Sequence, residues 1–238
     1  IGGKHMDTPG YDLLGLVTGS EGLLGLITEV TVRILPKPAL ARALLVGFPT
    51  VKASGQCVVD IITAGVIPAG MEMMDKAAIH AAEDFCNAGY PLDVEALLIV
   101  EMDGPKVEVD HLLQKVEEIA NSCGAINIRA SKNEAERLKF WAGRKAAFPA
   151  VGRISPDYYC IDGTIPRARL PEVLEYMSTL SVKYDLRVAN VFHAGDGNLH
   201  PLILYDANKP DELERTEKFG AEILKFCVEV GGVLTGEH

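Results

Sequence analysis

Val191-Phe192-His193-Ala194-Gly195-Asp196-Gly197-Asn198-Leu199-His200-Pro201 is the stretch that decides the fold. Two apolar strands are expected at about 187–194 and 199–205, and they flank the polar loop Gly195-Asp196-Gly197-Asn198. An Asp-Gly step in a short loop between apolar strands predicts a β-hairpin. A hairpin makes its two strands antiparallel. The sheet that contains it is therefore expected to be largely antiparallel.

The rest of the chain alternates between strand-like and helix-like patterns. Further strands are expected at about 43–48, 70–73, 96–101, 125–130 and 158–164. Helices are expected at about 50–64, 75–88, 132–147, 171–183 and 211–229, with another where Val109, Leu112, Leu113, Val116 and Ile119 recur at helical spacing. The simplest architecture is an α+β fold of ferredoxin-like type, with helices packed on one face of the sheet. Because the rhythm occurs twice, two such units can lie side by side.

The first 38 residues differ from this pattern, because they are rich in glycine and end in Pro36-Lys37-Pro38. Within them, Leu26–Ile34 alternates apolar and polar side chains, which predicts a half-buried strand. The two prolines mark a boundary, so residues 1–38 and 39–238 are expected to be separate domains. The start at Ile1-Gly2-Gly3-Lys4 and the end at Gly236-Glu237-His238 suggest a fragment of a longer chain.

Composition excludes several classes of protein. The formal net charge is −10, which disfavours a nucleic-acid partner because that binding depends on positive charge. The five cysteines include no CxxC pair, which favours reduced thiols in a cytoplasmic protein. No signal peptide and no apolar run of about 18 residues is visible, so no transmembrane segment is expected.

The hairpin carries a candidate metal site. If residues 195–198 form the loop, Ala194 pairs with Leu199 and His193 pairs with His200. The two imidazoles then face each other with Cβ atoms about 4.5–5.5 Å apart, so that both can bind one ion. Together with a carboxylate from Glu237 they suit Zn, Mn or Fe and leave positions open for substrate. The alternative is two hydrogen-bonded histidines on a solvent-facing hairpin.

Three separated segments resemble one known family, the FAD-linked oxidase C-terminal domain. They are His193–Pro201, the ending Gly232–His238, and the start from Gly10-Tyr11-Asp12-Leu13 through Gly19–Glu29. The family includes bacterial glycolate oxidase FAD subunits, D-lactate dehydrogenases and D-2-hydroxyglutarate dehydrogenases. Residues 141–148, 154–158 and 162–167 are most similar to the glycolate oxidase FAD subunits. The resemblance implies that residues 1–38 end an FAD-binding (PCMH-type) domain, and that residues 39–238 are a substrate or cap domain cut short at its end.

The resemblance also implies roles for individual residues. His193, His200 and Glu237 would bind a divalent metal, and His238 would be the base that takes the substrate hydroxyl proton. Arg144 would bind the substrate carboxylate, although from spacing alone an exposed helix arginine is the better interpretation. Asn198 could assist, but turn geometry explains it equally well. A flavin-contacting edge would comprise Gly19, Ser20, Gly22, Gly25 and Ile27.

The function implied by the resemblance is FAD-dependent oxidation of a small D-2-hydroxy acid, such as glycolate or D-lactate, to the 2-oxo acid. The substrate would be metal-bound and would pass hydride to flavin. Electrons would leave to an iron–sulfur or other electron-accepting subunit, the location would be cytoplasmic or peripheral at the inner membrane face, and a homodimer stays open. The fragment alone is expected to be inactive. Two alternatives remain: a metal-dependent hydrolase with a His/His/Glu site, and a non-catalytic ligand-binding or assembly module.

Overall fold

The computed structural model describes residues 10–236, which fall into two compact units divided between Lys37 and Pro38. In the first unit, helix α1 (Leu13–Val17) is capped at its N-terminus by Asp12, whose Oδ1 accepts a hydrogen bond from the Gly15 amide at 2.8 Å. The strand predicted at Leu26–Ile34 is wrong: these residues form no regular structure, and Ile27 and Ile34 are 65% and 86% exposed. Alternation shows which side chains could face a sheet. A strand also needs a neighbour's backbone hydrogen bonds, and no described residue supplies them.

The second unit is built on a seven-stranded sheet in the order β4-β1-β3-β2-β7-β9-β5. Its strands are β1 (Leu40–Phe48), β2 (Gly70–Asp75), β3 (Ala96–Gly104), β4 (Asn127–Ala130), β5 (Asp157–Cys160), β7 (Val188–Phe192) and β9 (Pro201–Tyr205). A small second sheet has the order β10-β6-β8 and comprises β6 (Gly163–Thr164), β8 (Asn198–Leu199) and β10 (Val233–Leu234). Neighbouring strands are antiparallel in both sheets, which confirms the predicted α+β class.

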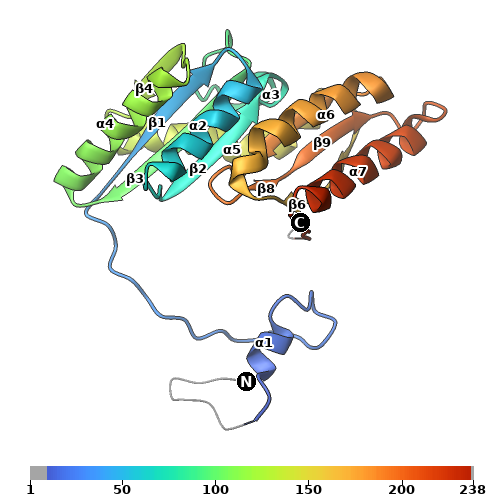
Figure 1. Cartoon of the computed structure of the whole chain (residues 1–238), viewed down its shortest axis with the longest axis horizontal. Coiled ribbons are helices and arrows are strands. Elements are labelled where there is room, and N and C mark those ends of the chain that lie inside the picture. The colour runs from blue at the N-terminus through green and yellow to red at the C-terminus, as the bar shows by residue number, and fades with distance from the viewer. Residues whose placement is uncertain (1–9, 237–238) are drawn as a thin grey trace. The chain divides into compact units, whose positions relative to one another are not determined.

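Helices cover both faces of the large sheet (Figure 1). They are α2 (Val51–Thr63), α3 (Lys76–Cys86), α4 (Lys106–Ser122), α5 (Glu134–Val151), α6 (Leu170–Tyr184) and α7 (Glu212–Glu229), with a short 3-10 turn η1 (Arg167–Arg169) before α6. Along β1, Leu44, Val46 and Phe48 pack into the core shared with α2, α4, α6 and α7. Ala43 and Leu45 point the other way, into the core shared with α3 and α5. The expectation of helices on one face is therefore corrected, because strand residues on both faces are apolar and each face needs a cover.

The predicted repetition of the fold is confirmed by the topology. The β1-α2-β2-β3-α4-β4 part has the βαββαβ pattern of a ferredoxin-like unit, with α3 inserted between β2 and β3. The β5-α6-β7-β9-α7 part repeats this pattern. The two ferredoxin-like units join where β2 pairs with β7. The repeat's last strand, β10, leaves the large sheet and pairs with β6 instead. This departure directs the end of the described chain toward the hairpin.

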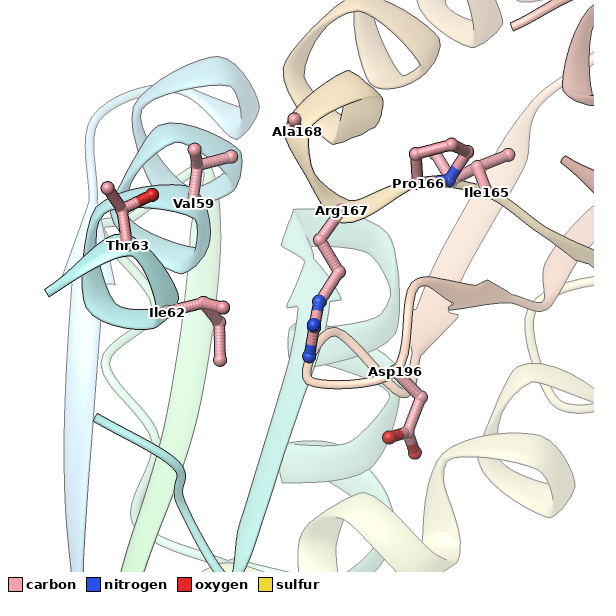
Figure 2. Close-up of a pocket in the computed structure, with 8 residues that line it drawn as sticks. All are labelled: Val59, Ile62, Thr63, Ile165, Pro166, Arg167, Ala168 and Asp196. Atoms are coloured by element: carbon pink, nitrogen blue, oxygen red, sulfur yellow. The ribbon is translucent and has the colours of Figure 1, made fainter. Parts of the chain in front are cut away.

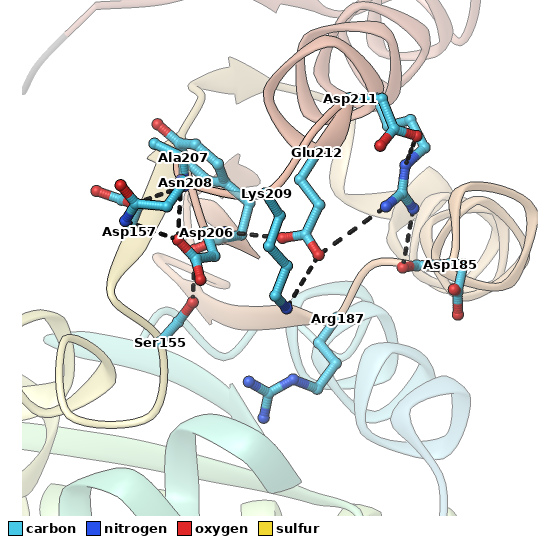
Figure 3. Close-up of polar contacts among 12 residues, drawn as sticks. Ser155, Asp157, Asp185, Arg187, Asp206, Ala207, Asn208, Lys209, Asp211 and Glu212 are labelled. Atoms are coloured by element: carbon cyan, nitrogen blue, oxygen red, sulfur yellow. Dashed lines mark hydrogen bonds and ion pairs between the residues drawn. The ribbon is translucent and has the colours of Figure 1, made fainter.

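The turn between β9 and α7 is held by side-chain hydrogen bonds to backbone amides (Figure 3). Asp206 Oδ1 accepts from the Asn208 amide at 2.9 Å, and Glu212 Oε2 accepts from the Asp206 amide at 2.7 Å. Asp157 Oδ2 accepts from the Ala207 amide at 2.9 Å, which ties the turn to β5. These bonds fix the far end of β9, the strand that follows the hairpin.

Across residues 10–236, none of the helices has the length and apolarity needed to span a membrane.

Candidate functional site

The hairpin puts His193 and His200 on one face, in a different register from the predicted one. His193 lies opposite Asn198, with its amide 3.1 Å from the Asn198 carbonyl oxygen, so the predicted pairs His193–His200 and Ala194–Leu199 are wrong. The error is two residues, and side chains alternate with a period of two. His200 therefore stays on the face of His193, diagonally across the hairpin. Their ring centroids are 4.9 Å apart and the rings are perpendicular.

The turn itself runs over residues 194–197 and is tightly bonded. The His193 carbonyl oxygen accepts from the amides of Asp196, Gly197 and Asn198 at 3.1, 3.1 and 3.3 Å. Gly197 has a φ of +76°, and a Cβ there would lie 2.3 Å from the Ile165 carbonyl oxygen. Only glycine fits both the conformation and the space. The loop is therefore a rigid base for the two imidazoles.

Glu72 joins His193 to Arg144. Its Oε1 lies 2.8 Å from His193 Nδ1, and its Oε2 accepts from Arg144 Nε at 2.9 Å. The side chains of Arg144 and Glu72 are only 10% and 12% exposed, whereas that of His193 is 38% exposed. The interpretation of Arg144 as an exposed helix arginine is therefore wrong: α5 directs it inward, beside the histidine pair.

Asp162 has the same role for His200. Its Oδ1 lies 2.6 Å from His200 Nδ1, and the His200 side chain is completely buried. Phe148 of α5 contacts the His200 ring edge-on, with centroids 6.3 Å apart at 62°. The alternative of two histidines on a solvent-facing hairpin does not describe His200.

Glu72 and Asp162 are the residues that sequence reasoning missed. Each is a single acid in an apolar surrounding, Met71-Glu72-Met73 and Ile161-Asp162-Gly163, and that isolation was the available signal. A buried carboxylate rarely occurs without a partner. The partner, however, lies 121 residues away for Glu72 and 38 residues away for Asp162.

The donor set around the two histidines fits a divalent metal. Histidines that bind metals usually donate their second ring N–H to a carboxylate, which fixes the tautomer and the ring orientation. Both imidazoles have a carboxylate at Nδ1, and in the tautomer that donates from Nδ1 the lone pair that a metal takes is on Nε2. No group of three His, Cys, Asp or Glu side chains with metal-site geometry occurs within residues 10–236. The third predicted ligand, Glu237, and the predicted base, His238, lie outside the described residues.

Residues 233–235, near the end of the described chain, lie beside Asp162 and Asn198. Strand β10 pairs with β6, and the Thr235 amide donates to the Asp162 carbonyl oxygen at 3.4 Å. Asn198 is 9% exposed, and its Oδ1 accepts from the hydroxyls of Thr164 at 3.3 Å and Thr235 at 3.4 Å. Asn198 therefore does more than complete a turn, because it links the hairpin to β6 and to the chain just before Glu237.

The predicted flavin-contacting residues lie in the first unit. Gly19 and Gly22 have φ values of +78° and +79°, so turn geometry accounts for both. A Cβ at Gly19, Gly22 or Gly25 would meet no atom within 4 Å. Ser20 is half-buried and Ile27 is exposed. These residues of the first unit form an open surface and do not by themselves enclose a cofactor.

A cavity of about 610 Å³ lies between α2 and the segment that leads into α6 (Figure 2). Val59, Ile62 and Thr63 line one side, and Arg167 extends from the other side toward the hairpin. Arg167 Nη1 donates to the Gly195 carbonyl oxygen at 3.0 Å. The imidazoles of His193 and His200 are not among the residues that line this cavity. The hydrogen bond to Gly195 indicates that Arg167 supports the turn of the hairpin.

An antiparallel α+β domain with this site defines the class: the chain belongs to the family of FAD linked oxidases, C-terminal domain, whose sequence profile matches residues 37–238. This confirms the resemblance. The glycolate oxidase subunit GlcD of Escherichia coli K12 is 60% identical over 238 residues, which are 100% of this chain and 48% of that protein. GlcD of Bacillus subtilis is 37% identical over 100% of this chain and 51% of that protein. A probable mitochondrial D-lactate dehydrogenase of Danio rerio is 32% identical over 96% and 46%.

The chain thus spans about half the length of the curated relatives it matches. Among solved structures, alkyldihydroxyacetonephosphate synthase matches with a TM-score of 0.67 and 18% identity, over 94% of this chain and 45% of that one. p-Cresol methylhydroxylase matches with a TM-score of 0.61 and 13% identity, over 84% and 45%. At these identities the structures support the fold alone.

Proposed function

We propose that this chain forms the substrate-binding part of an FAD-dependent dehydrogenase that oxidises a small D-2-hydroxy acid, glycolate or D-lactate, to the 2-oxo acid. The names of the relatives, glycolate oxidase subunit and D-lactate dehydrogenase, support the reaction class. The observation that carries the proposal is the arrangement of Arg144 beside two imidazoles, each oriented by a carboxylate. Arg144 can bind a carboxylate, and a metal on the histidine pair would bind a hydroxyl. A 2-hydroxy acid carries these two groups on adjacent carbons.

In this proposal His193 and His200 bind a divalent metal, Zn, Mn or Fe, through Nε2, and Glu237 completes the set. The orientation of the rings by Glu72 and Asp162 supports the first two ligands. The hydrogen bonds of Thr235 to Asp162 and Asn198 support the third.

Each polar side chain then has a task. Arg144, held by Glu72 at Nε, presents its Nη edge to the substrate carboxylate. Bound metal and FAD would supply a Lewis acid that lowers the pKa of the substrate hydroxyl and an acceptor for the hydride. His238 would take the hydroxyl proton as a base. Asn198 positions the hairpin relative to β6.

Residues 1–38 are proposed as the end of an FAD-binding domain, with Gly19, Ser20, Gly22, Gly25 and Ile27 toward the cofactor. The exposure of Ile27 and the open space at the three glycines support this assignment. Electrons would pass to an iron–sulfur or other electron-accepting subunit. The chain without the rest of the flavin domain is proposed to be inactive.

The test uses the full-length protein that carries this chain. It should show a flavin absorbance spectrum, contain metal by elemental analysis, and reduce its flavin with glycolate or D-lactate. His193→Ala combined with His200→Ala should remove the metal and the activity, whereas His111→Ala on the exposed side of α4 should remove neither. A colourless protein that hydrolyses esters or phosphates would overturn the proposal in favour of a metal-dependent hydrolase.

A further inference from the structure

Helix α5 turns two side chains toward the histidine pair, Arg144 and Phe148. They are four residues apart, so they lie one above the other on the same helix face. The helix is fixed at this level by Tyr90, whose hydroxyl donates to the Phe140 carbonyl oxygen. Gly143 allows the close approach, because a Cβ there would lie 2.3 Å from the Tyr90 hydroxyl. The spacing between Arg144 and Phe148 is therefore set by a rigid element.

Phe148 lies beside the His200 imidazole, one helical turn beyond Arg144. Its ring meets the His200 ring edge-on at 6.3 Å, and His193 meets the same His200 ring at 4.9 Å. Arg144 is tied to His193 through the two oxygens of Glu72. We call Arg144, the imidazole pair and Phe148 together the corner.

We propose that Phe148 determines which substituent on C2 of the substrate is accepted. The inference rests on the proposed function, in which the carboxylate lies at Arg144 and the hydroxyl lies at the histidine pair. With those two groups placed, the remaining substituent on C2 meets the side chain one helical turn beyond Arg144, which is Phe148.

The chemistry of a phenyl ring defines the class of substituent. Phe148 offers no hydrogen-bond donor or charge, so a second carboxylate would lose its water there without gaining a partner. Its bulk limits the length of an apolar substituent. The corner therefore selects 2-hydroxy monocarboxylic acids with hydrogen or methyl on C2, and it discriminates against longer and dicarboxylic 2-hydroxy acids.

A purely structural role for Phe148 makes a different prediction. The ring is half-buried and also packs against the core that α3 and α5 share. If packing were its only role, shortening it would lower stability and would reduce the activity toward all substrates by the same factor. The ratio of kcat/KM values between substrates separates the two roles, because a loss of folded enzyme cancels in that ratio.

The experiment is a size series at position 148 in the full-length flavoprotein: Phe148→Ala, Phe148→Leu, wild type and Phe148→Trp. Values of kcat/KM are measured for glycolate, D-lactate, D-2-hydroxybutyrate and D-malate. Phe148→Ala should raise the ratio of D-2-hydroxybutyrate to glycolate by about tenfold, the usual effect of a methylene-sized space. Phe148→Leu should give a smaller rise, and Phe148→Trp should lower the ratio of D-lactate to glycolate.

D-Malate should remain a poor substrate of every variant, since none supplies a partner for its second carboxylate. The matched control is Phe226→Leu, which trims an aromatic ring packed on Tyr176 in α6 and should leave all ratios unchanged. Ratios that stay constant across the series, with wild type active on glycolate, would overturn the role of Phe148 and leave the proposed function standing. Wild type that oxidises none of the four acids would overturn the proposed function, and the role of Phe148 with it.

Discussion

Asp162 and His200 form a buried pair in which Oδ1 lies 2.6 Å from Nδ1 and the imidazole has no exposed surface. An imidazole at such a position is oriented by its carboxylate, so the direction of Nε2 depends on Asp162. Asp162 lies in the segment between β5 and β6, and its backbone carbonyl oxygen accepts from the Thr235 amide at 3.4 Å. If His200 binds a metal, Asp162 has a measurable effect on the affinity.

Asp162→Asn should lower the affinity of the full-length protein for a divalent metal by about 10–100-fold, the usual effect of losing an outer-shell carboxylate. The amide keeps the size of the side chain but removes its charge and one acceptor oxygen. Calorimetric titration of the metal-free protein with Zn²⁺ measures the change. Asp84→Asn, an exposed change on α3, is the control. Equal affinities for Asp162→Asn and the control would show that His200 is not a ligand.

Glu72 should contribute to stability chiefly as the partner of Arg144. Both side chains are largely buried, and removal of one member of such a pair leaves an uncompensated charge that costs about 3–5 kcal/mol. Glu72→Ala should lower the free energy of unfolding by that amount in urea titrations. The double variant Glu72→Leu/Arg144→Met removes both charges, so it should recover much of the loss. A double variant as unstable as Glu72→Ala would contradict this account.

Alanine substitutions at Gly124 and Gly197 distinguish the cost of a left-handed backbone conformation from the cost of a steric clash at Cβ. Gly124 has a φ of +81° and open space at its Cβ position, whereas Gly197 has a φ of +76° and the Ile165 carbonyl oxygen 2.3 Å from its Cβ position. Gly124→Ala should cost about 1–2 kcal/mol for the left-handed conformation alone. Gly197→Ala should cost about 1–3 kcal/mol more, because the backbone must also move. Equal losses in urea unfolding would mean that the hairpin relaxes without resistance.

The hairpin shows what the sequence predicts well and why. Its two imidazoles share a face because side chains alternate with a period of two, so an error of two residues in the register preserves the face. The register depends on where the turn begins. The Asp-Gly step suggested residues 195–198, but the amides of residues 196–198 all donate to the His193 carbonyl oxygen, which moves the turn one residue earlier.

The remaining errors have a common cause, which is that pairing over long distances leaves little trace in local pattern. Residues 26–34 alternate as a strand does, but alternation does not supply a partner strand. Glu72 joins His193 across 121 residues, and only the β2–β7 pairing brings them together. The apolar runs of β1 and β3 carry side chains for both cores, so they already indicated a sheet covered on two faces.

Asp75 is a buried carboxyl group at the end of β2, close to the point where the two ferredoxin-like units join. Its Oδ1 accepts from the Ala78 amide at 3.1 Å, and its Oδ2 accepts from the amide and the side chain of Asn190, both at 2.8 Å. Burial raises its pKa from 3.8 to about 6, and the hydrogen bonds from Ala78 and Asn190 offset only part of that rise. The folded protein therefore binds this proton more tightly than the unfolded chain does.

The sign of the resulting pH dependence follows from linkage. Below about pH 4 the group is protonated in both states, and its stabilising contribution is fully present; as the pH rises to about 6 the folded state loses its advantage. The free energy of unfolding of the wild type, relative to Asp75→Asn, should therefore fall between pH 4 and pH 6 and level off above pH 7. Urea titrations of both proteins across that range measure it. A difference that stays constant or rises with pH would show that hydrogen bonding, and not burial, dominates at Asp75.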